Sequence, residues 1–592
     1  MNRIFFLGFF LISLSSLFAQ DRFIHVDQFG YYSTATKVAV LSDPQIGFNA
    51  NESYTPFSTI YVIDNSTNEV VFSAAPSVWS GGSTDHLSGD RGWWFDFSDF
   101  TTEGTYYIND PVNNISSAVF EINENPYFEV LQAATKMFYY NRCNMDKVEP
   151  YAGANWTDGM NFDKALQDYN CRYIYDPSNA NLEKDLSGGW FDAGDYNKYV
   201  TFTYTVIHNL LQAYQATPSL FADNWNLPES GNGLPDLLDE VKWELDWLIK
   251  MTNEDGSVHI KMGSQNYAEN TASPPSANTD QRFYGPTCTS ASATIASTFA
   301  HAALVFQEFP AYASYVEELE TIARNCFDYT MPFLLNGTLE TDCDDGSIVA
   351  GDADMSVPVQ REVLISAATY LYALTGDQVY NDYVIEHAPL TEPVDGGFWG
   401  AYKLSLYDAL LLYTTLDGAE ESLISNIRST FYNSVGNNWN GYYGMVNLGL
   451  YRDFMPEWSY HWGSNNAKAG YGCLNLLIPT YDIFGQAEDY YQRAEEYVHA
   501  FHGVNPMGQV ALSNMYPYGA DHSANEIYHT WFNDGTPYDH ALNSELGPAP
   551  GFVVGGANSN FSVEWLSPPS GQPAAKSYLD FNTGFYGLKI AV

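Results

Sequence analysis

Basic side chains are scarce in this sequence. It holds 24 Lys and Arg residues against 71 Asp and Glu residues, which leaves a formal net charge of −47. A surface of this charge repels a polyanion, so the composition argues against nucleic acid as a partner. An uncharged ligand meets no such repulsion.

Cysteine is scarce as well, with six residues in a chain of 592. So few cysteines exclude a fold held together by a framework of disulfides. The six are Cys143, Cys171, Cys288, Cys326, Cys343 and Cys473. Export would permit pairing, and the pairs Cys143–Cys171 and Cys326–Cys343 both remain open.

Long apolar runs are absent after the first 20 residues, so we expect no later segment to cross a bilayer and no membrane partner. Arg3, an apolar run over residues 4–17 and a plausible cleavage zone at residues 17–20 are typical of a secretory signal. A membrane anchor is the alternative, but the run is short for a span. We therefore expect residues 1–20 to be a signal peptide and the protein to be secreted.

Aromatic side chains are abundant, at 16% of the chain with 45 Tyr and 14 Trp. Their flat apolar faces can stack on sugar rings, which suits a long carbohydrate-binding cleft. Aromatic side chains buried in a helical core would give the same count, so composition alone does not separate the two interpretations.

The most informative stretch is Gly188 to Tyr199, with the sequence GGWFDAGDYNKY. Asp192 and Asp195 stand three residues apart on a glycine-containing turn. A carboxylate held in this way can act as a general base on a water molecule. The alternative is a loop that caps a helix, because Asp before a helix accepts hydrogen bonds from unpaired N–H groups. For an isolated Asp-x-x-Asp that alternative is favoured.

Two domains follow from the hydrophobic period. Short β-rich runs bounded by turn residues fill residues 21–122 and predict a β-sandwich. From residue 123 the period changes to 3.6, and about a dozen helices are expected over residues 123–592. Periodicity alone does not separate an (α/α)6 barrel from an α-solenoid.

Residues 188–199 resemble the base motif of glycoside hydrolase family 9, the inverting cellulases. Residues 26–31, VDQFGY, resemble the opening of the Ig-like domain that precedes many catalytic domains of this family. The resemblance implies an Ig-like β-sandwich followed by an all-α (α/α)6 barrel that cleaves β-1,4-glucan in cellulose or related polymers. It also implies that Asp195 is the catalytic base and that Asp192 helps to orient the water.

Further strings carry the resemblance along the helical domain, among them residues 461–465, HWGSN, and residues 503–508, GVNPMG. A histidine downstream of the second string binds substrate in the family. The side chains expected to line the sugar subsites are Trp190, Tyr199, Trp462, Tyr528 and His529. We expect a monomer that needs no organic cofactor.

Metal binding is the least defined expectation. An oxygen-rich loop suits calcium and holds Asp342, Asp344, Asp345, Asp352 and Asp354. A solvated acidic loop is the equal alternative. Some members of the family bind zinc near the base motif through Cys and His, but Arg172 follows Cys171 here, so no full zinc ligand set is visible.

The resemblance breaks at the general acid. Inverting hydrolysis needs a second carboxyl group roughly 6.5–9.5 Å from the base. The family supplies it from a Glu near the C-terminus, but this chain follows the family to Gly584 and then shows no acid in residues 585–592. The last Glu, Glu564, lies upstream of the usual place. Two readings stay open: a β-1,4-glucanase impaired by this loss, or a β-glucan-binding relative without catalysis.

Overall fold

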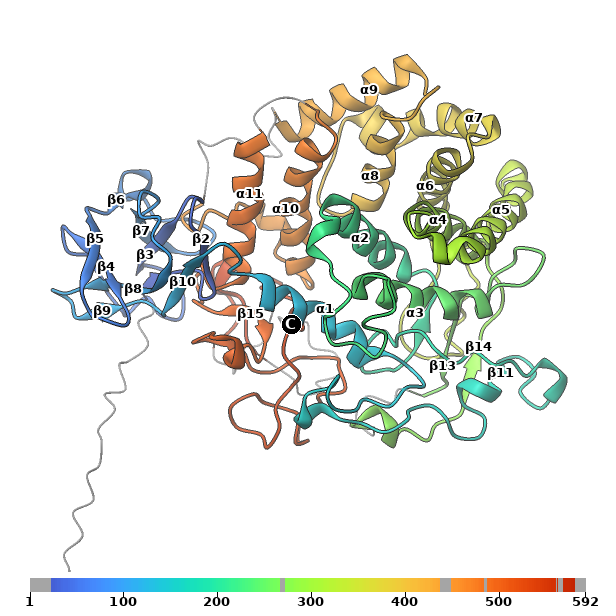
Figure 1. Cartoon of the computed structure of the whole chain (residues 1–592), viewed down its shortest axis with the longest axis horizontal. Coiled ribbons are helices and arrows are strands. Elements are labelled where there is room, and N and C mark those ends of the chain that lie inside the picture. Colours follow the sequence, from blue (N-terminus) through green and yellow to red (C-terminus); the bar gives the residue numbers. More distant parts are fainter. Residues whose placement is uncertain are drawn as a thin grey trace, which may run out of the picture.

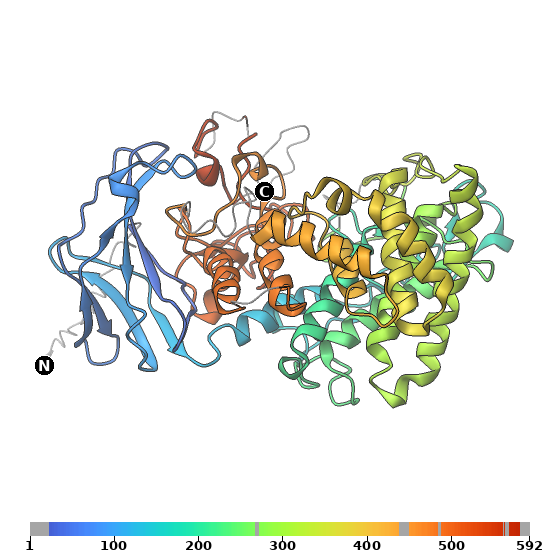
Figure 2. The same cartoon turned by 90° about the horizontal axis from the view of Figure 1, so that it is seen from above.

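A computed structural model describes residues 23–266, 272–436, 449–483, 487–560, 562 and 568–580. Figure 1 shows two parts side by side: a small β-rich module at the N-terminus and a larger helical domain. Seen from above, the module packs against one flank of the helical domain, next to α10 and α11 (Figure 2).

The N-terminal module is a sandwich of two sheets. One sheet has the strand order β1-β3-β7-β6, and the other has the order β2-β10-β8-β4-β5 with β9 paired to β8. The strands are β1 Ile24–His25, β2 Gly30–Tyr32, β3 Val38–Pro44, β4 Ile60–Asp64, β5 Val70–Ala74, β6 Ser77–Val78, β7 Asp90–Asp96, β8 Gly104–Asp110, β9 Ile115–Ser116 and β10 Phe120–Asn123. Alternate side chains of β8 and β10 are buried, which is the period-2 pattern of a half-buried sheet.

Eleven α-helices lie within the described residues. They are α1 Phe128–Asn141, α2 Thr203–Ala216, α3 Asp236–Met251, α4 Thr289–Phe306, α5 Ala313–Asn336, α6 Val357–Thr375, α7 Gln378–His387, α8 Leu404–Tyr413, α9 Glu421–Phe431, α10 Ser464–Thr480 and α11 Ala487–Phe501. Helices α4, α6 and α8 are buried along nearly their whole length, whereas α5, α7 and α9 keep one exposed face. The first three therefore form an inner layer and the second three an outer layer.

The inner helices begin at one end of the domain. Thr289, the first residue of α4, donates a hydrogen bond of 2.8 Å to Gln360 near the start of α6. Lys403, just before α8, lies 2.8 Å from Glu362 of α6. Short connections at residues 307–312, 376–377 and 414–420 join each inner helix to its outer partner. The long loops therefore gather at the end where the inner helices begin.

A small sheet in these loops supports the base motif. Its strand order is β11-β14-β13-β12, with β11 Arg172–Tyr173, β12 Lys198–Tyr199, β13 Lys261–Ser264 and β14 Arg282–Tyr284. β12 is the end of the Gly188 to Tyr199 stretch and pairs antiparallel with β13. The carboxylate turn is therefore anchored in a sheet rather than left as a free loop.

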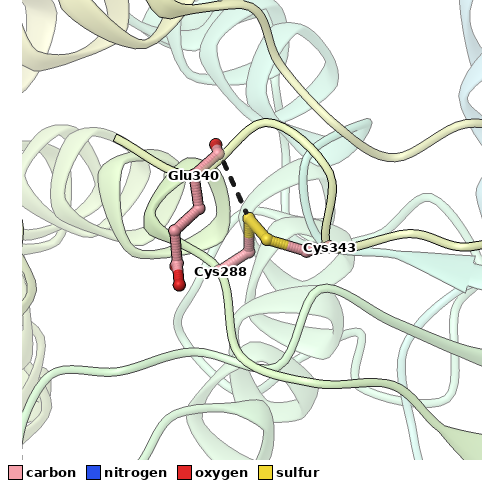
Figure 3. A group of neighbouring side chains, drawn as sticks. All are labelled: Cys288, Glu340 and Cys343. Atoms are coloured by element: carbon pink, nitrogen blue, oxygen red, sulfur yellow. Dashed lines mark hydrogen bonds between the residues drawn. A yellow bond between two sulfur atoms is a disulfide. The ribbon is translucent and has the colours of Figure 1, made fainter. Parts of the chain in front are cut away.

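The cysteines pair differently from either expected pair. Cys288 and Cys343 form a disulfide, while Cys143, Cys171, Cys326 and Cys473 are free. A Cys326–Cys343 bond, one of the two pairs that the sequence left open, does not form, because Cys326 is buried inside α5, whereas Cys288 precedes α4 beside the loop of Cys343. Figure 3 shows the disulfide with the backbone oxygen of Glu340 next to Cys288. Both sulfurs are bonded to each other, so this group is not a metal site.

No helix in the described part of the chain combines the length and the apolar character that crossing a bilayer requires.

Candidate active site

Asp195 is the best-held carboxylate of the base motif. It is buried, and the Tyr199 hydroxyl donates a hydrogen bond of 2.6 Å to its Oδ2 atom. Asn197 adds two donors, with its side-chain amide 3.2 Å from Oδ2 and its backbone N–H 3.1 Å from Oδ1. These three donors fix the orientation of the carboxylate, so Asp195 can accept a proton from a water molecule placed beside it.

Asp192 occupies a different environment three residues earlier. Its side chain reaches solvent, and its backbone N–H donates to the carbonyl of Asn197 at 2.8 Å. The protein packed around it removes hydration and, together with the negative charge of Asp195, raises the pKa of Asp192 to about 6. The charge of the His529 imidazole lowers the pKa of Asp192 and so opposes this rise. The imidazole therefore lies within electrostatic range of the carboxyl group.

The backbone of the turn is tightly constrained. Gly189 has a φ of +71°, and a Cβ atom there would lie 2.8 Å from the ring of Trp247. Tyr196 takes a φ of +59° without being glycine, and its buried ring packs against Phe191. The N–H of Gly194 donates to the carbonyl of His529 at 2.9 Å. The turn is thus fixed from below by α3 and from the side by the segment that carries His529.

Trp190 does not line a sugar subsite, contrary to the expectation from sequence. Its side chain is only 8% exposed, its ring packs against Phe138, and its indole N–H donates to Glu240 at 3.2 Å. Its backbone N–H donates to Glu244 at 2.6 Å. Trp190 therefore fastens the base motif to α3, a role that depends on residues about 50 positions further along the chain.

Tyr199 also has a different role from the expected one. Its ring is buried and stacks on Phe202 with the centroids 4.4 Å apart, and its hydroxyl also lies 2.9 Å from the carbonyl of Ala350. The ring face is covered, so it does not stack on a sugar. Tyr199 instead acts through Asp195, as the nearest donor to its carboxylate.

Exposed aromatic side chains gather on the loops before α8 and α10. Trp462 is 62% exposed, Trp458 is 55% exposed and Tyr402 is 44% exposed. The Tyr402 hydroxyl lies 2.8 Å from Nε2 of His461, and the two rings are stacked. We call Tyr402, Trp458, His461 and Trp462 the aromatic patch. Trp462 was expected from sequence; Tyr402 and Trp458 were missed, although both are aromatic residues in the loops that lead into α8 and α10.

Tyr528 and His529 lie together on the segment that contacts the base motif. Both are half-buried, with ring centroids 5.9 Å apart, and His529 has a φ of +60°. The structure therefore brings His529 to the two carboxylates, and places Trp462 on a loop at the end where the inner helices begin.

The acidic loop satisfies its carboxylates with protein donors. Asp354 accepts the backbone N–H groups of Cys343 and Asp344, and Asp344 accepts that of Ala353 and pairs with Lys261 at 2.5 Å. Asp345 and Asp352 accept backbone N–H groups two residues on. Calcium binding by Asp342 and its neighbours stays a prediction.

A second acidic group lies at the start of α3. Oxygens of Asp223, Asp236 and Asp239 approach within 4.8 Å of one another. Asp236 and Asp239 are buried, and one oxygen of each has no hydrogen-bond partner among the described residues. Burial raises the pKa of Asp239 to about 7. These carboxylates fit a hard divalent cation better than the acidic loop does.

The general acid is not assigned. Glu564 and residues 581–592 lie outside the described residues. Asp580, the last described acid, accepts hydrogen bonds from Tyr578, Gln509 and Asn525. These hydrogen bonds tie Asp580 to the segments of Gln509 and Asn525, which gives it a structural role there.

A two-layered helical barrel with paired carboxylates in the long loops at one end is the arrangement of a glycoside hydrolase. The comparisons with known proteins agree. A family model described as Glycosyl hydrolase family 9 matches residues 127–586, and one described as Cellulase N-terminal ig-like domain matches residues 19–113. This chain belongs to glycosyl hydrolase family 9.

Relatives and solved structures cover nearly the whole chain. Endoglucanase D of Acetivibrio thermocellus is 25% identical over 561 residues, which is 90% of this chain and 77% of that protein. A cellodextrinase of Butyrivibrio fibrisolvens is 31% identical over 298 residues, 50% of this chain and 49% of that protein. The structure of a metagenome-derived family 9 endoglucanase aligns with a TM-score of 0.77 at 25% identity over 94% of both chains. The helical domain is consistent with the (α/α)6 barrel of these neighbours.

Proposed function

We propose that this protein is a secreted, monomeric glycoside hydrolase that cleaves β-1,4-glucosidic bonds in cellulose or a related β-glucan with inversion. The observation that carries the proposal is Asp195, buried and held by Tyr199 and Asn197 beside Asp192. Family membership and the endoglucanase relatives support the substrate class.

In this mechanism a water molecule sits between the sugar and the two carboxylates. Asp195 accepts a proton from that water as the water oxygen attacks the anomeric carbon from the face opposite the leaving group. The glycosidic C–O bond breaks in the same step, and the leaving oxygen takes a proton from a solvent hydronium or from a carboxylic acid outside the described residues. When Asp192 is ionised, its carboxylate accepts a hydrogen bond from the second O–H of the same water. Because the pKa of Asp192 is raised to about 6, this requires a pH above about 6. Both carboxylates orient the water, but only Asp195 takes a proton from it.

The aromatic patch gives the substrate a platform. Indole and phenol rings bind sugars by stacking on the C–H faces while the hydroxyl groups stay hydrated. Trp462 and Trp458 are exposed enough for this, and His529 is near Asp192. We expect an extended glucan to lie across these loops with one glycosidic bond at the Asp192–Asp195 turn.

Product analysis tests the proposal. Wild-type protein is incubated with cellohexaose, and the anomer of the new reducing ends is followed by NMR. Inverting cleavage yields the α-anomer first. Retention of the β-anomer, or tight cellohexaose binding in calorimetry without any release of product, would contradict the proposed reaction.

A further inference from the structure

The side chain of Gln28, in the N-terminal module, forms four hydrogen bonds with the helical domain. It lies in the bend between β1 and β2 and is only 5% exposed. Its amide nitrogen donates to the carbonyls of Gly508 at 3.0 Å and His522 at 3.4 Å. Its amide oxygen accepts the backbone N–H groups of Asp521 at 2.8 Å and His522 at 2.9 Å. Both ends of the amide are thus used on one distant segment.

The residue before it strengthens the same joint. Asp27 is fully buried, and one of its oxygens lies 2.9 Å from Nδ1 of both His499 and His502, which end α11. The N–H of Gln28 donates to the carbonyl of His502 at 3.1 Å. A Cβ at Gly503 would lie 2.7 Å from the Gln28 amide nitrogen, so the backbone approaches the module as closely as glycine allows.

The segment gripped in this way leads to the base motif. We call residues 503–529 the docking segment. Within it β15 Val510–Ser513 pairs with β16 Ser523–Ala524, and the N–H of Val510 donates to the carbonyl of His522, the residue that Gln28 holds. Five residues after β16 comes His529, whose carbonyl accepts the N–H of Gly194 between the two candidate carboxylates.

We propose that Gln28 is a positioning residue for the active site. It fixes β15 and β16 so that His529 is held against the Asp192–Asp195 turn, and the N-terminal module thereby sets the geometry of a site it does not touch. This inference rests on the proposed function of Asp195. The proposed role is more than stabilisation. Burial of apolar surface is not directional, whereas the Gln28 amide is aligned with four backbone groups of one segment and so fixes their geometry.

Two substitutions and one matched control separate positioning from general stabilisation. Gln28→Ala removes all four hydrogen bonds. Gln28→Glu keeps the shape and the acceptor but sets a carboxylate oxygen against two carbonyl oxygens. The control is Trp94→Phe, which removes another hydrogen bond between module and barrel, 2.8 Å from the Trp94 indole to the carbonyl of Leu450, and leaves all four Gln28 hydrogen bonds in place.

Three measurements are made on each full-length variant: the thermal midpoint, kcat and KM on an aryl cellobioside, and hydrogen exchange of the backbone amides. We expect both Gln28 variants to lower kcat on the order of tenfold, because small misplacements of catalytic groups are costly, with little change in KM. Exchange should accelerate in peptides covering residues 189–199 and 525–533. Trp94→Phe should lower the thermal midpoint without either effect.

The kinetic measurements test the proposed function, and hydrogen exchange tests the positioning role independently. If wild-type protein hydrolyses no β-glucan or aryl glucoside, the proposed function fails, and exchange still decides the positioning role. Unchanged exchange at residues 189–199 in both Gln28 variants would overturn the inference. So would a loss of kcat in Trp94→Phe equal to that in Gln28→Ala, since any weakening of the module joint would then have the same result.

Discussion

Tyr199, at the end of β12, donates a hydrogen bond of 2.6 Å from its phenol to the carboxylate of Asp195, which lies four residues earlier in the turn that leads into this strand. The same phenol lies 2.9 Å from the carbonyl of Ala350, in the loop before α6. One hydroxyl therefore links the candidate base to a loop more than 150 residues away, and the orientation of Asp195 depends on both.

Tyr199→Phe should lower kcat on the order of tenfold to a hundredfold, because a hydrogen bond to a charged group contributes about 1.5–3 kcal/mol. The ring and its stacking on Phe202 remain, so the fold should persist. Steady-state kinetics on an aryl cellobioside measure the change. The control is Tyr204→Phe, which removes a hydroxyl at the start of α2 that is hydrogen-bonded to Ser366 of α6. Equal activity in the two variants would show that the Tyr199 phenol does not orient the base.

Glu244 makes the stability of the base motif depend on pH. It is buried beneath Trp190, and burial raises its pKa to about 8 despite the Trp190 N–H and the charge of Lys198. Because the folded-state pKa lies above that of an exposed Glu, stability from this group is full below about pH 4.5 and is lost as the pH rises through 8.

Glu244→Gln keeps an oxygen for the Trp190 N–H but carries no titrating proton. As the pH rises from 5 to 8, the free energy of unfolding of this variant should therefore increase relative to that of wild type by roughly 1.4 kcal/mol for each pH unit. Its thermal midpoint should rise relative to that of wild type over the same range. Exposed Glu254 on the turn after α3 provides the control Glu254→Gln. A constant offset between wild type and Glu244→Gln across this range would mean that Glu244 is ionised in the folded protein.

The Cys288–Cys343 disulfide joins the start of α4 to the acidic loop across 55 residues. Cross-links of this kind typically contribute about 2–4 kcal/mol, mainly by restricting the unfolded chain. The double variant Cys288→Ser/Cys343→Ser should unfold at lower denaturant concentration than wild type, and adding a reductant should lower only the wild-type midpoint. An identical midpoint for both proteins without reductant would show that the bond does not form in solution.

Local signals predicted much of this molecule. The turn carrying Asp192 and Asp195 is defined by its own glycine and aromatic neighbours. The 3.6 period predicts helices over residues 291–308 and 359–375, within two residues of the observed bounds of α4 and α6. Helix α7 Gln378–His387 was not predicted as a separate helix; it is only 10 residues long and packs on α6.

The roles of individual side chains depended on distant contacts. Trp190 and Tyr199 are aromatic residues beside the carboxylates, which in sequence suits a sugar platform. Glu240 and Glu244 on α3 draw Trp190 inward, and the loop at Ala350 covers Tyr199. The disulfide partner of Cys343 likewise depends on the fold, which brings the Cα atom of Cys288 to 6.0 Å from that of Cys343. Spacing along the chain contains none of this information.

The central claim is that Asp195 is the base of an inverting β-glucanase, and the most direct test is the turnover of Asp195→Ala beside Asp192→Ala. Release of reducing sugar from carboxymethyl cellulose is measured for both variants and wild type at pH 7, above the pKa of Asp192. Wild type should hydrolyse the polymer, Asp195→Ala should lose about 10²–10⁴-fold in rate, and Asp192→Ala should keep more activity than Asp195→Ala. Hydrolysis by Asp195→Ala at the wild-type rate would contradict the account.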